Sequence, residues 1–245
     1  MLHAKVKSET LKGIVDIVST LVDEAKFNVA ADKLTLKAVD PAHVAMVNMT
    51  IQKDAFDEYS ADETELGVDL DKMKEVLRLS KAGEVMELEQ DEERNRLVIN
   101  VGNITRRMNL VDTTGMSDPK VPNINLPARV AVNSDELQKG IKAAESVSDH
   151  IALTASPDGF EMFSEGETDS VSLKLPKDLL VSLECKEKVR SLFPLDYFSN
   201  MVKAIPAGTV VTLSIGSDYP VKLEFTMANG KGTVDYLLAP RIESD

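Results

Sequence analysis

The strongest constraint on the fold is an internal repeat that spans about half of the chain. Ser8-Glu9-Thr10-Leu11 is matched by Ser134-Asp135-Glu136-Leu137, and Leu70-Asp71 is matched by Leu195-Asp196. Ala82-Gly83 is likewise matched by Ala207-Gly208. The shift between the copies is about 125 residues each time, far above the roughly 20–50 residues of a solenoid repeat. The 245-residue chain is therefore expected to hold two copies of one domain, at residues 1–112 and 128–245.

Amphipathic helices alternate with short strands in each copy. Apolar residues recur at helical spacing over residues 8–24, 70–81, 134–148 and 195–205, with Ser8 and Ser134 at the positions of N-caps. Alternating apolar and polar residues predict strands at 34–38, 97–101, 171–175, 211–215 and 221–225. Asn229-Gly230 predicts a hairpin turn. The expected fold class is α+β, with two duplicated domains of antiparallel sheet and helices on one face.

Residues 113–127 join the two copies and have the composition of a linker. Gly115, Pro119, Pro122 and Pro127 interrupt regular structure there. Loosely spaced apolar side chains occupy the same segment, namely Met116, Val121, Ile124 and Leu126. Two interpretations remain open: these side chains pin the linker onto the sheets, or they form one wall of a groove for a partner peptide.

The composition argues against most classes of enzyme and binding protein. With 41 Asp+Glu against 28 Lys+Arg, the net charge of −13 opposes electrostatic binding of nucleic acid by the chain as a whole. Cys185 is the single cysteine, and His3, His43 and His150 are scattered, so no disulfide and no metal site is expected. No phosphate-binding loop or catalytic cluster occurs, which predicts a protein that is not an enzyme and has no cofactor. Without a signal peptide or an apolar span, we expect a cytoplasmic protein without membrane contact.

Positive charge is nevertheless concentrated on the expected helices. The segment 71–81 carries Lys72, Lys74, Arg78 and Lys81 against only Asp71 and Glu75. Lys139 and Lys142 share one helix face because they are three residues apart. Two interpretations remain open here as well: ordinary solvated helix faces, or a basic surface hidden within an acidic protein.

Four segments together resemble the PCNA family of sliding clamps, and the archaeal-type members in particular. They are Leu21-Val22-Asp23-Glu24-Ala25, Ala38-Val39-Asp40-Pro41-Ala42-His43-Val44, Ser146-Val147-Ser148-Asp149 and Leu237-Leu238-Ala239-Pro240-Arg241-Ile242-Glu243. The resemblance covers the whole chain. It implies a DNA clamp fold that assembles into a closed trimeric ring, with sheets outside and helices lining the hole.

The resemblance also implies the function, that of a DNA sliding clamp. Such a ring encircles double-stranded DNA topologically, without sequence preference, and is a processivity factor in DNA replication and DNA repair rather than an enzyme. DNA polymerase, clamp loader, flap endonuclease and DNA ligase would bind it through short peptide motifs. Three identical copies would form the ring (a homotrimer), in the cytoplasm and associated with the nucleoid.

The resemblance assigns three sets of residues. The DNA-binding ring lining would comprise Lys12, Lys74, Arg78, Lys81, Lys139, Lys142 and Lys203, although Gly13, Ser19 and Glu75 stand where the family is often basic. The partner-peptide groove would comprise Val39, His43, Val44, Met116, Val121, Pro122, Pro220, Ala239, Pro240, Arg241 and Ile242. The subunit interface would pair two edge strands through Arg106, Arg107, Met108 and Leu110 on one subunit and Val171, Leu173 and Leu175 on the next.

Two alternatives to a homotrimeric clamp make different demands on the sequence. An enzyme or small-molecule binder on a duplicated α+β scaffold would need clustered carboxylates or histidines in a pocket, and the sequence has none in evident proximity. A clamp relative that assembles with non-identical subunits would share the same motifs, so its distinction from a homotrimer requires a measurement of mass.

Overall fold

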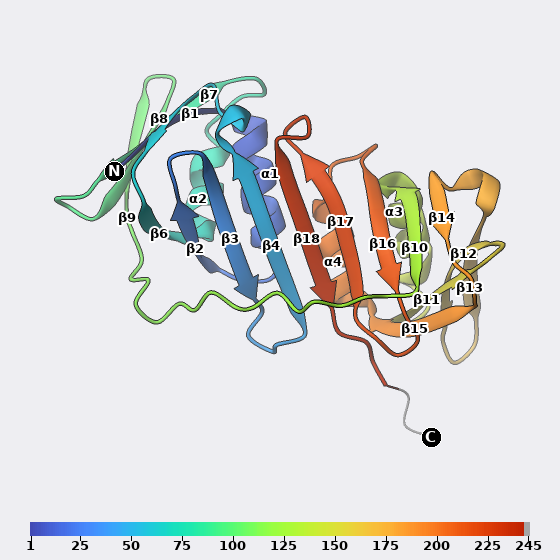
Figure 1. Cartoon of the computed structure of the whole chain (residues 1–245). Helices are drawn as coiled ribbons and strands as arrows, with labels where there is room; N and C mark the ends of the chain where they lie inside the picture. The colour runs from blue at the N-terminus through green and yellow to red at the C-terminus, as the bar shows by residue number, and fades with distance from the viewer. Residues whose placement is uncertain (243–245) are drawn as a thin grey trace. The chain divides into compact units, whose positions relative to one another are not determined.

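The computed structural model describes residues 1–242, so Glu243 of the tail motif lies outside the described residues. The chain forms two compact units (Figure 1). Unit 1 contains residues 1–41, 47–120 and 226–234, and unit 2 contains residues 42–46, 121–225 and the chain from Asp235 onward. Each unit is thus built mainly from one half of the sequence, with a short segment contributed by the other half.

The first half of the chain contains two helices, α1 (Ser8–Val18) and α2 (Leu70–Leu77), and a short 3-10 turn η1 (Lys53–Ala55). Its strands are β1 (Leu2–Lys7), β2 (Glu24–Val29), β3 (Lys33–Val39), β4 (Ala45–Gln52), β5 (Glu58–Ala61), β6 (Thr64–Asp69), β7 (Val85–Asp91), β8 (Arg96–Val101) and β9 (Ile104–Asn109).

The second half repeats this order, with helices α3 (Ser134–Ala144) and α4 (Leu195–Ala204) and the 3-10 turn η2 (Lys177–Leu179). Its strands are β10 (Ala128–Asn133), β11 (His150–Ser156), β12 (Gly159–Glu165), β13 (Ser170–Pro176), β14 (Ser182–Glu184), β15 (Val189–Pro194), β16 (Val210–Ile215), β17 (Val221–Met227) and β18 (Gly232–Leu238).

Sheet topology confirms the duplication. Neighbouring strands follow the order β5-β1-β7-β8-β9 in the first half and β14-β10-β16-β17-β18 in the second. The other strands follow β6-β2-β3-β4 and β15-β11-β12-β13. Each order maps onto its counterpart strand by strand. Antiparallel pairing occurs in both halves, as between β1 and β7, between β8 and β9, where Leu97 lies opposite Met108, and between β10 and β16. The predicted α+β class with antiparallel sheets is confirmed.

Each helix buries one apolar stripe and leaves the other face in solvent. In α1 the stripe includes Leu11, Ile14, Val15 and Val18, and in α3 it is formed by Leu137, Ile141 and Ala144. Gly140 brings α3 close to the sheet, because a Cβ there would lie 2.7 Å from the Met162 sulfur. The lysines and arginine of the helices are left on the outward faces.

The helices are shorter than the apolar periodicity predicted. The prediction that the first helix runs to residue 24 is wrong: α1 ends at Val18, and Glu24 begins β2. The hydroxyl of Thr20 donates to the Ile17 carbonyl at 2.7 Å, and this bond replaces a further helical turn. Likewise α2 ends at Leu77, where Ser80 donates to the Leu77 carbonyl at 2.7 Å, and α3 and α4 end at Ala144 and Ala204.

The predicted N-caps are also wrong, by one residue. Lys7 and Asn133 occupy the N-cap positions, and Asn133 accepts a hydrogen bond from the Asp135 N–H at 2.9 Å. Ser8 and Ser134 are instead buried, and their hydroxyls donate to the carbonyls of Lys81 and Pro206 at 2.9 and 3.1 Å. These serines tie the start of the first helix of each unit to the turn that follows the second helix.

A carboxylate strengthens the same connection in both units. Glu9 accepts a hydrogen bond from the N–H of Gly83, and Asp135 accepts one from the N–H of Gly208 at 3.1 Å. Gly83 and Gly208 have φ values of 78° and 74°, a left-handed conformation that glycine adopts without steric cost. Hydrogen bonds from its own backbone N–H and from Gly83 lower the pKa of Glu9. The repeated tetrapeptide, Ser8–Leu11 and Ser134–Leu137, therefore forms the same connection in both halves, between the start of the first helix and the turn after the second helix.

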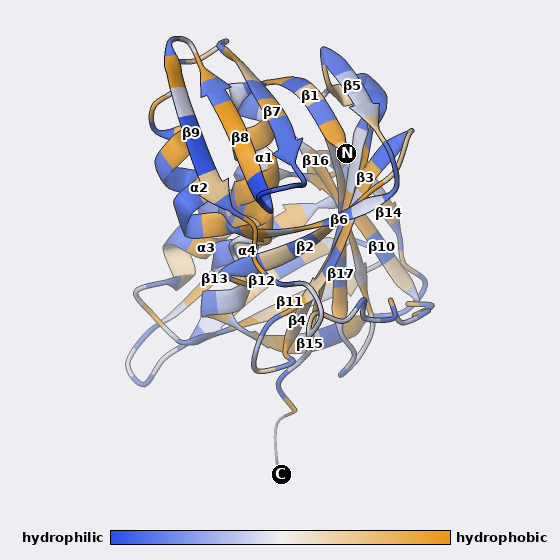
Figure 2. Cartoon of the chain, turned by 90° about the vertical axis from the view of Figure 1, so that its left-hand side faces the viewer, coloured by the Kyte–Doolittle hydropathy of each residue, from blue (hydrophilic) through white to orange (hydrophobic). Residues whose placement is uncertain are grey.

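The strands predicted for a subunit interface both lie at an edge of their sheet. β9 ends the order β5-β1-β7-β8-β9, and β13 ends the order β15-β11-β12-β13. Figure 2 shows that β9 is polar over most of its length, whereas its neighbour β8 is largely apolar. Among the described residues, no helix is long and apolar enough to cross a membrane.

We expect Asp135→Ala to destabilise unit 2, because the Gly208 N–H loses its acceptor and α3 loses a carboxylate in its first turn. The expected loss in the free energy of unfolding is about 1 kcal/mol. Urea denaturation followed by circular dichroism measures it. Glu167→Ala, which removes an exposed loop carboxylate, is the control. Equal stabilities of the two variants would contradict the role given to Asp135.

Candidate nucleic-acid and partner surfaces

The resemblance assigned seven cations to a DNA-facing lining. All seven lie on the outward faces of the four helices or in the turn that follows a helix. Lys12 lies on α1, Lys74 on α2, Lys139 and Lys142 on α3, and Lys203 on α4. Arg78 and Lys81 follow the end of α2, where Arg78 is the C-cap. Lys74 is half-buried, and the other six residues are exposed.

Most of these cations are paired with a carboxylate of their own unit. Lys74 lies 3.2 Å from Asp71, Lys139 lies 3.9 Å from Glu136, and Lys12 contacts Asp16. In the described part of the chain, the side chains of Arg78, Lys81 and Lys142 have no such partner. Among the seven assigned cations, positive charge without a carboxylate partner is therefore confined to these three residues.

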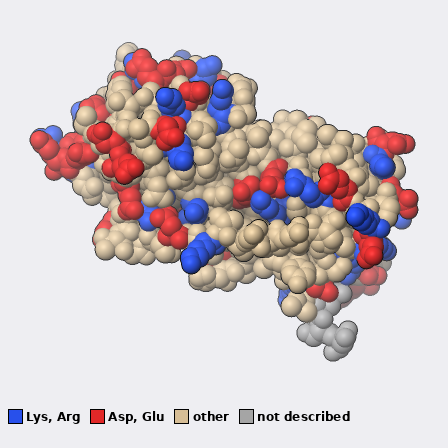
Figure 3. Space-filling model, in the orientation of Figure 1, with Lys and Arg blue, Asp and Glu red and all other residues tan. Residues whose placement is uncertain are grey.

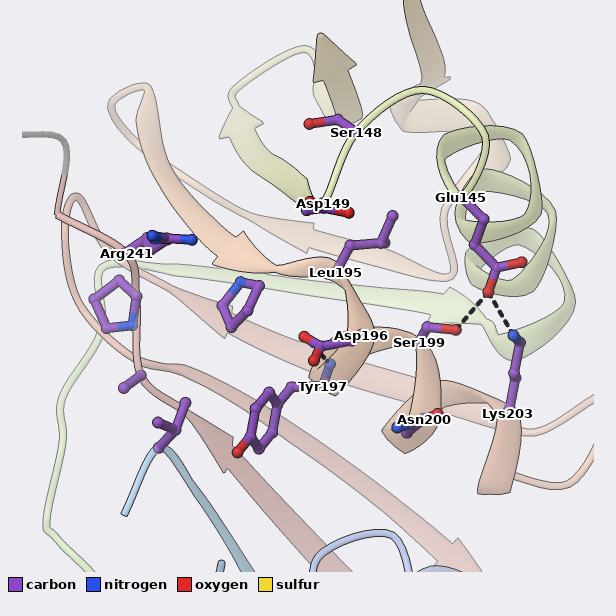
Figure 4. A pocket seen from close by; sticks show the side chains of 14 residues that line it. Glu145, Ser148, Asp149, Leu195, Asp196, Tyr197, Ser199, Asn200, Lys203 and Arg241 are labelled. Atoms are coloured by element: carbon purple, nitrogen blue, oxygen red, sulfur yellow. Dashed lines mark hydrogen bonds and ion pairs between the residues drawn. The ribbon is translucent and has the colours of Figure 1, made fainter. Parts of the chain in front are cut away.

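Lys203 is held by an acidic residue that sequence analysis did not single out. Glu145, at the C-cap of α3, accepts hydrogen bonds from the Lys203 ammonium and from the Ser199 hydroxyl, the latter at 2.8 Å (Figure 4). The Lys203 ammonium, followed by the Ser199 hydroxyl, lowers the pKa of Glu145. This ion pair joins α3 to α4 and neutralises much of the charge that Lys203 offers.

A cavity of about 750 Å³ opens in unit 2 beside this ion pair. The start of α4, the segment between α3 and β11, Val44 and the tail residues Ala239, Pro240 and Arg241 line it. Figure 4 shows Leu195 and Tyr197 of α4 and Arg241 of the tail around the opening. Four residues that the resemblance assigned to a peptide groove thus share one cavity: Val44, Ala239, Pro240 and Arg241.

Backbone hydrogen bonds position the tail in unit 2. The N–H of Ala239 donates to the carbonyl of Val44 at 2.8 Å, and the N–H of Arg241 donates to Leu192 at 2.6 Å. The Arg241 guanidinium also contacts the His150 imidazole. Beyond this bridge Ile242 is 75% exposed, which leaves an apolar side chain available at the end of the described chain.

The other predicted groove residues lie in loops, except Val39, which ends β3. His43 is exposed and has a φ of 57°, an uncommon conformation for a residue other than glycine. Pro220 directly precedes β17, and Val121 and Pro122 lie in the linker between β9 and β10. Val39, the last residue of β3, and Met116 belong to unit 1 and are half-buried.

The residues predicted for a subunit interface differ in where their side chains point. Arg107, Val171 and Leu173 are at least partly exposed on the edge strands. Met108, Leu110 and Leu175 are instead buried in their own unit, because alternate residues of an edge strand face its core. Arg106 lies 3.4 Å from Glu75 of the same chain. The side chains of Met108, Leu110 and Leu175 are therefore not available to another strand, whereas Arg106 stays about half exposed beside its acidic neighbour.

Acidic and basic side chains are interspersed on the face shown in Figure 3. No group of three or more histidine, cysteine or carboxylate side chains that could hold a metal ion occurs among residues 1–242. Cys185 donates to the Glu187 carbonyl, and burial raises its thiol pKa, which is unlike an activated nucleophile.

Comparison with known proteins matches the two halves of the chain to two domains of one protein family. Residues 1–116 match the family model "Proliferating cell nuclear antigen, N-terminal domain", and residues 120–241 match "Proliferating cell nuclear antigen, C-terminal domain". The DNA polymerase sliding clamp of Methanocella arvoryzae is 42% identical over 100% of both chains. That of Methanococcoides burtonii is 40% identical, again over 100% of both.

The fold is also similar to solved structures. A structure described as the C-terminal region of FEN-1 bound to A. fulgidus PCNA superimposes with a TM-score of 0.94 at 32% identity, covering 100% of each chain. The PCNA of Thermococcus kodakaraensis superimposes with a TM-score of 0.91 over 98% of this chain and 100% of its own, at 24% identity. The second likeness concerns the fold alone.

We expect Lys203→Ala to raise the pKa of Glu145 toward its ordinary value of 4.5, because the largest cause of its depression is removed. A lowered pKa means that the ion pair stabilises the folded state above pH 4.5 and is lost as the pH falls through the depressed value. A carbon-detected NMR titration of the Glu145 carboxyl measures the change. Lys139→Ala is the matched control, and an unchanged Glu145 titration in Lys203→Ala would contradict the pairing.

Proposed function

The chain belongs to the proliferating cell nuclear antigen family, and on that premise we propose how it acts as a DNA polymerase sliding clamp. It is a processivity factor and not an enzyme. Three identical copies close into a ring around double-stranded DNA and tether DNA polymerase and other replication and repair proteins. The single observation that carries this function is the match of both halves, in order, to the two domains of the family.

Ring closure accounts for an acidic DNA-binding protein. A ring is retained on DNA by enclosure, so it needs few phosphate contacts, and strong ones would hinder sliding. We place the DNA beside the outward helix faces, contacted by Lys12, Lys74, Arg78, Lys81, Lys139, Lys142 and Lys203. The weak, mostly paired charge of these faces supports loose contact. An acidic exterior keeps the ring soluble and away from other nucleic acid.

Partner proteins are proposed to bind through a short helical turn with one aliphatic and two aromatic anchors. The tail from Ala239 to Ile242, the loop at His43 and Val44, the linker residues Val121 and Pro122, Pro220, Val39 and Met116 would form the groove. The cavity beside the tail supports this assignment within unit 2. A flap endonuclease, a DNA ligase, a clamp loader and the polymerase would share the groove.

Subunits are proposed to join head to tail by pairing β9 of one copy with β13 of the next. Both strands have an open edge, and pairing would satisfy their free backbone groups. Arg107, Val171 and Leu173 would add side-chain contacts. Domain boundaries at 1–112 and 128–245, and a cytoplasmic location on the nucleoid, complete the proposal.

The first test is the mass in solution. Sedimentation at several protein and salt concentrations should give about 80 kDa, three times the 26.8 kDa of one chain. Association that needs a second, non-identical relative would instead favour a heterotrimer. A persistent 26.8 kDa species, even at high concentration and in the presence of such relatives, would contradict the ring.

The second test concerns the DNA-facing charge. Because Arg78 and Lys142 have no carboxylate partner, Arg78→Ala/Lys142→Ala should shorten retention on circular DNA and flatten its dependence on salt. Each lost phosphate contact lowers the salt slope by roughly 0.9. The matched variant Lys12→Ala/Lys139→Ala removes the same formal charge from paired residues and should lose less. Equal losses would contradict the distinction, and no loss in either variant would contradict the lining.

A further inference from the structure

A lysine on β2 holds both the linker and the neighbouring strand. The Lys26 ammonium lies 3.0 Å from Oδ2 of Asp118 in the linker and 3.4 Å from Oε1 of Glu65 on β6. Its side chain is only 9% exposed. Asn28, two residues along β2 and on the same face, donates from Nδ2 to Oδ1 of Asp118 at 3.0 Å. Both carboxylate oxygens of Asp118 are therefore held by β2.

Other contacts fasten the segment that leads to Asp118. The N–H of Val111 donates to the Gly67 carbonyl at 2.8 Å, and the Thr113 hydroxyl donates to Oε2 of Glu65 at 3.0 Å. Gly67 is required for this approach, because a Cβ there would lie 2.1 Å from the Val111 oxygen. The segment from Val111 to Asp118 is thereby fixed to unit 1.

The chain beyond Asp118 is held much less. From Pro119 to Pro127, the described residues form no backbone hydrogen bond, and regular pairing resumes only at Ala128 in β10. Pro119, Pro122 and Pro127 have no N–H to donate. Asp118 is therefore the last fixed residue before the segment 119–127, and the position of Asp118 determines where that segment begins.

We propose that Lys26, Asn28 and Asp118 form a clasp that positions the linker for partner peptides, so that breaking the clasp weakens peptide binding. The inference rests on the proposed function, because the linker residues beyond Asp118 are those proposed to line the groove. A segment held in its bound position loses less conformational freedom when a ligand binds. Asp118 and its partners are thus positioning residues, with no contact to the peptide required.

The clasp differs from an ordinary surface ion pair. Exposed pairs contribute little because water and salt screen them, whereas Lys26 is largely removed from solvent and has two carboxylate neighbours. The hydrogen bond that the Lys26 ammonium donates to the Asp118 carboxylate lowers the pKa of Asp118 and raises the pKa of Lys26. Both groups therefore stay charged through the neutral range, and the clasp opens only as the pH falls through the depressed pKa of Asp118.

The test compares Lys26→Met with Lys33→Met, a change of equal charge on the adjacent strand β3. Lys26→Met keeps an apolar stem in the buried site but removes the ammonium. Hydrogen exchange over residues 112–121 should become faster in Lys26→Met and stay unchanged in Lys33→Met. In calorimetry, the Kd of a synthetic peptide with one aliphatic and two aromatic anchors should rise about three- to tenfold. Asp118→Ala, at the exposed end of the pair, should reproduce both effects if Lys26→Met fails to fold.

The double variant Lys26→Met/Asp118→Ala should be no worse than either single variant, because both remove one interaction. Unchanged exchange, or faster exchange with unchanged peptide affinity, would overturn the clasp. Deletion of residues 239–245 separates this outcome from failure of the proposed groove. A wild-type chain that binds no peptide, or binds it equally well without the tail, would refute the groove and with it the role given to the clasp.

Discussion

The connection between the first helix and the turn after the second helix fixes the helix faces that we propose to lie beside DNA. In unit 1 the Ser8 hydroxyl and the Glu9 carboxylate reach Lys81 and Gly83, and in unit 2 Ser134 and Asp135 repeat the connection. Each helix also buries an apolar stripe, so its outward face cannot rotate without exposing core residues. The cations of the helices are therefore placed by the fold itself, before any DNA is present.

That placement explains how an acidic chain can act on DNA. In the ring proposed above, enclosure replaces affinity, so the helix faces would have only to keep the duplex away from the walls of the ring. Intrahelical partners such as Asp16 and Glu136 reduce the charge that Lys12 and Lys139 present. Each additional phosphate contact would release counterions and deepen the energy wells along the duplex. A partly neutralised lining thus favours movement over residence at one position.

The sequence predicted the duplication, the fold class and most elements, because apolar periodicity and turn residues are local signals. It misplaced the helix ends, where the outcome depends on contacts that are distant in sequence. Ser8 is a residue type that often caps helices, but its hydroxyl donates to the carbonyl of Lys81, 73 residues away. The family resemblance placed β9 and β13 at sheet edges, where the structure has them, yet it did not show that Met108 and Leu175 are buried in their own unit.

The sequence allowed site residues to be predicted only where they belong to a motif shared with the family. The tail and the loop at His43 belong to segments shared with the family, whereas Lys26 and Asp118 are 92 residues apart and in no motif. The contacts that fasten the linker are polar, whereas the interpretations of its composition concerned its apolar side chains. Its first part is pinned to β2 and β6, and its second part makes no backbone hydrogen bond within the described chain. A linker that is fixed up to Asp118 and makes no backbone hydrogen bond beyond it can adjust to different peptides while its starting position stays the same. A groove shared by several partners requires both properties.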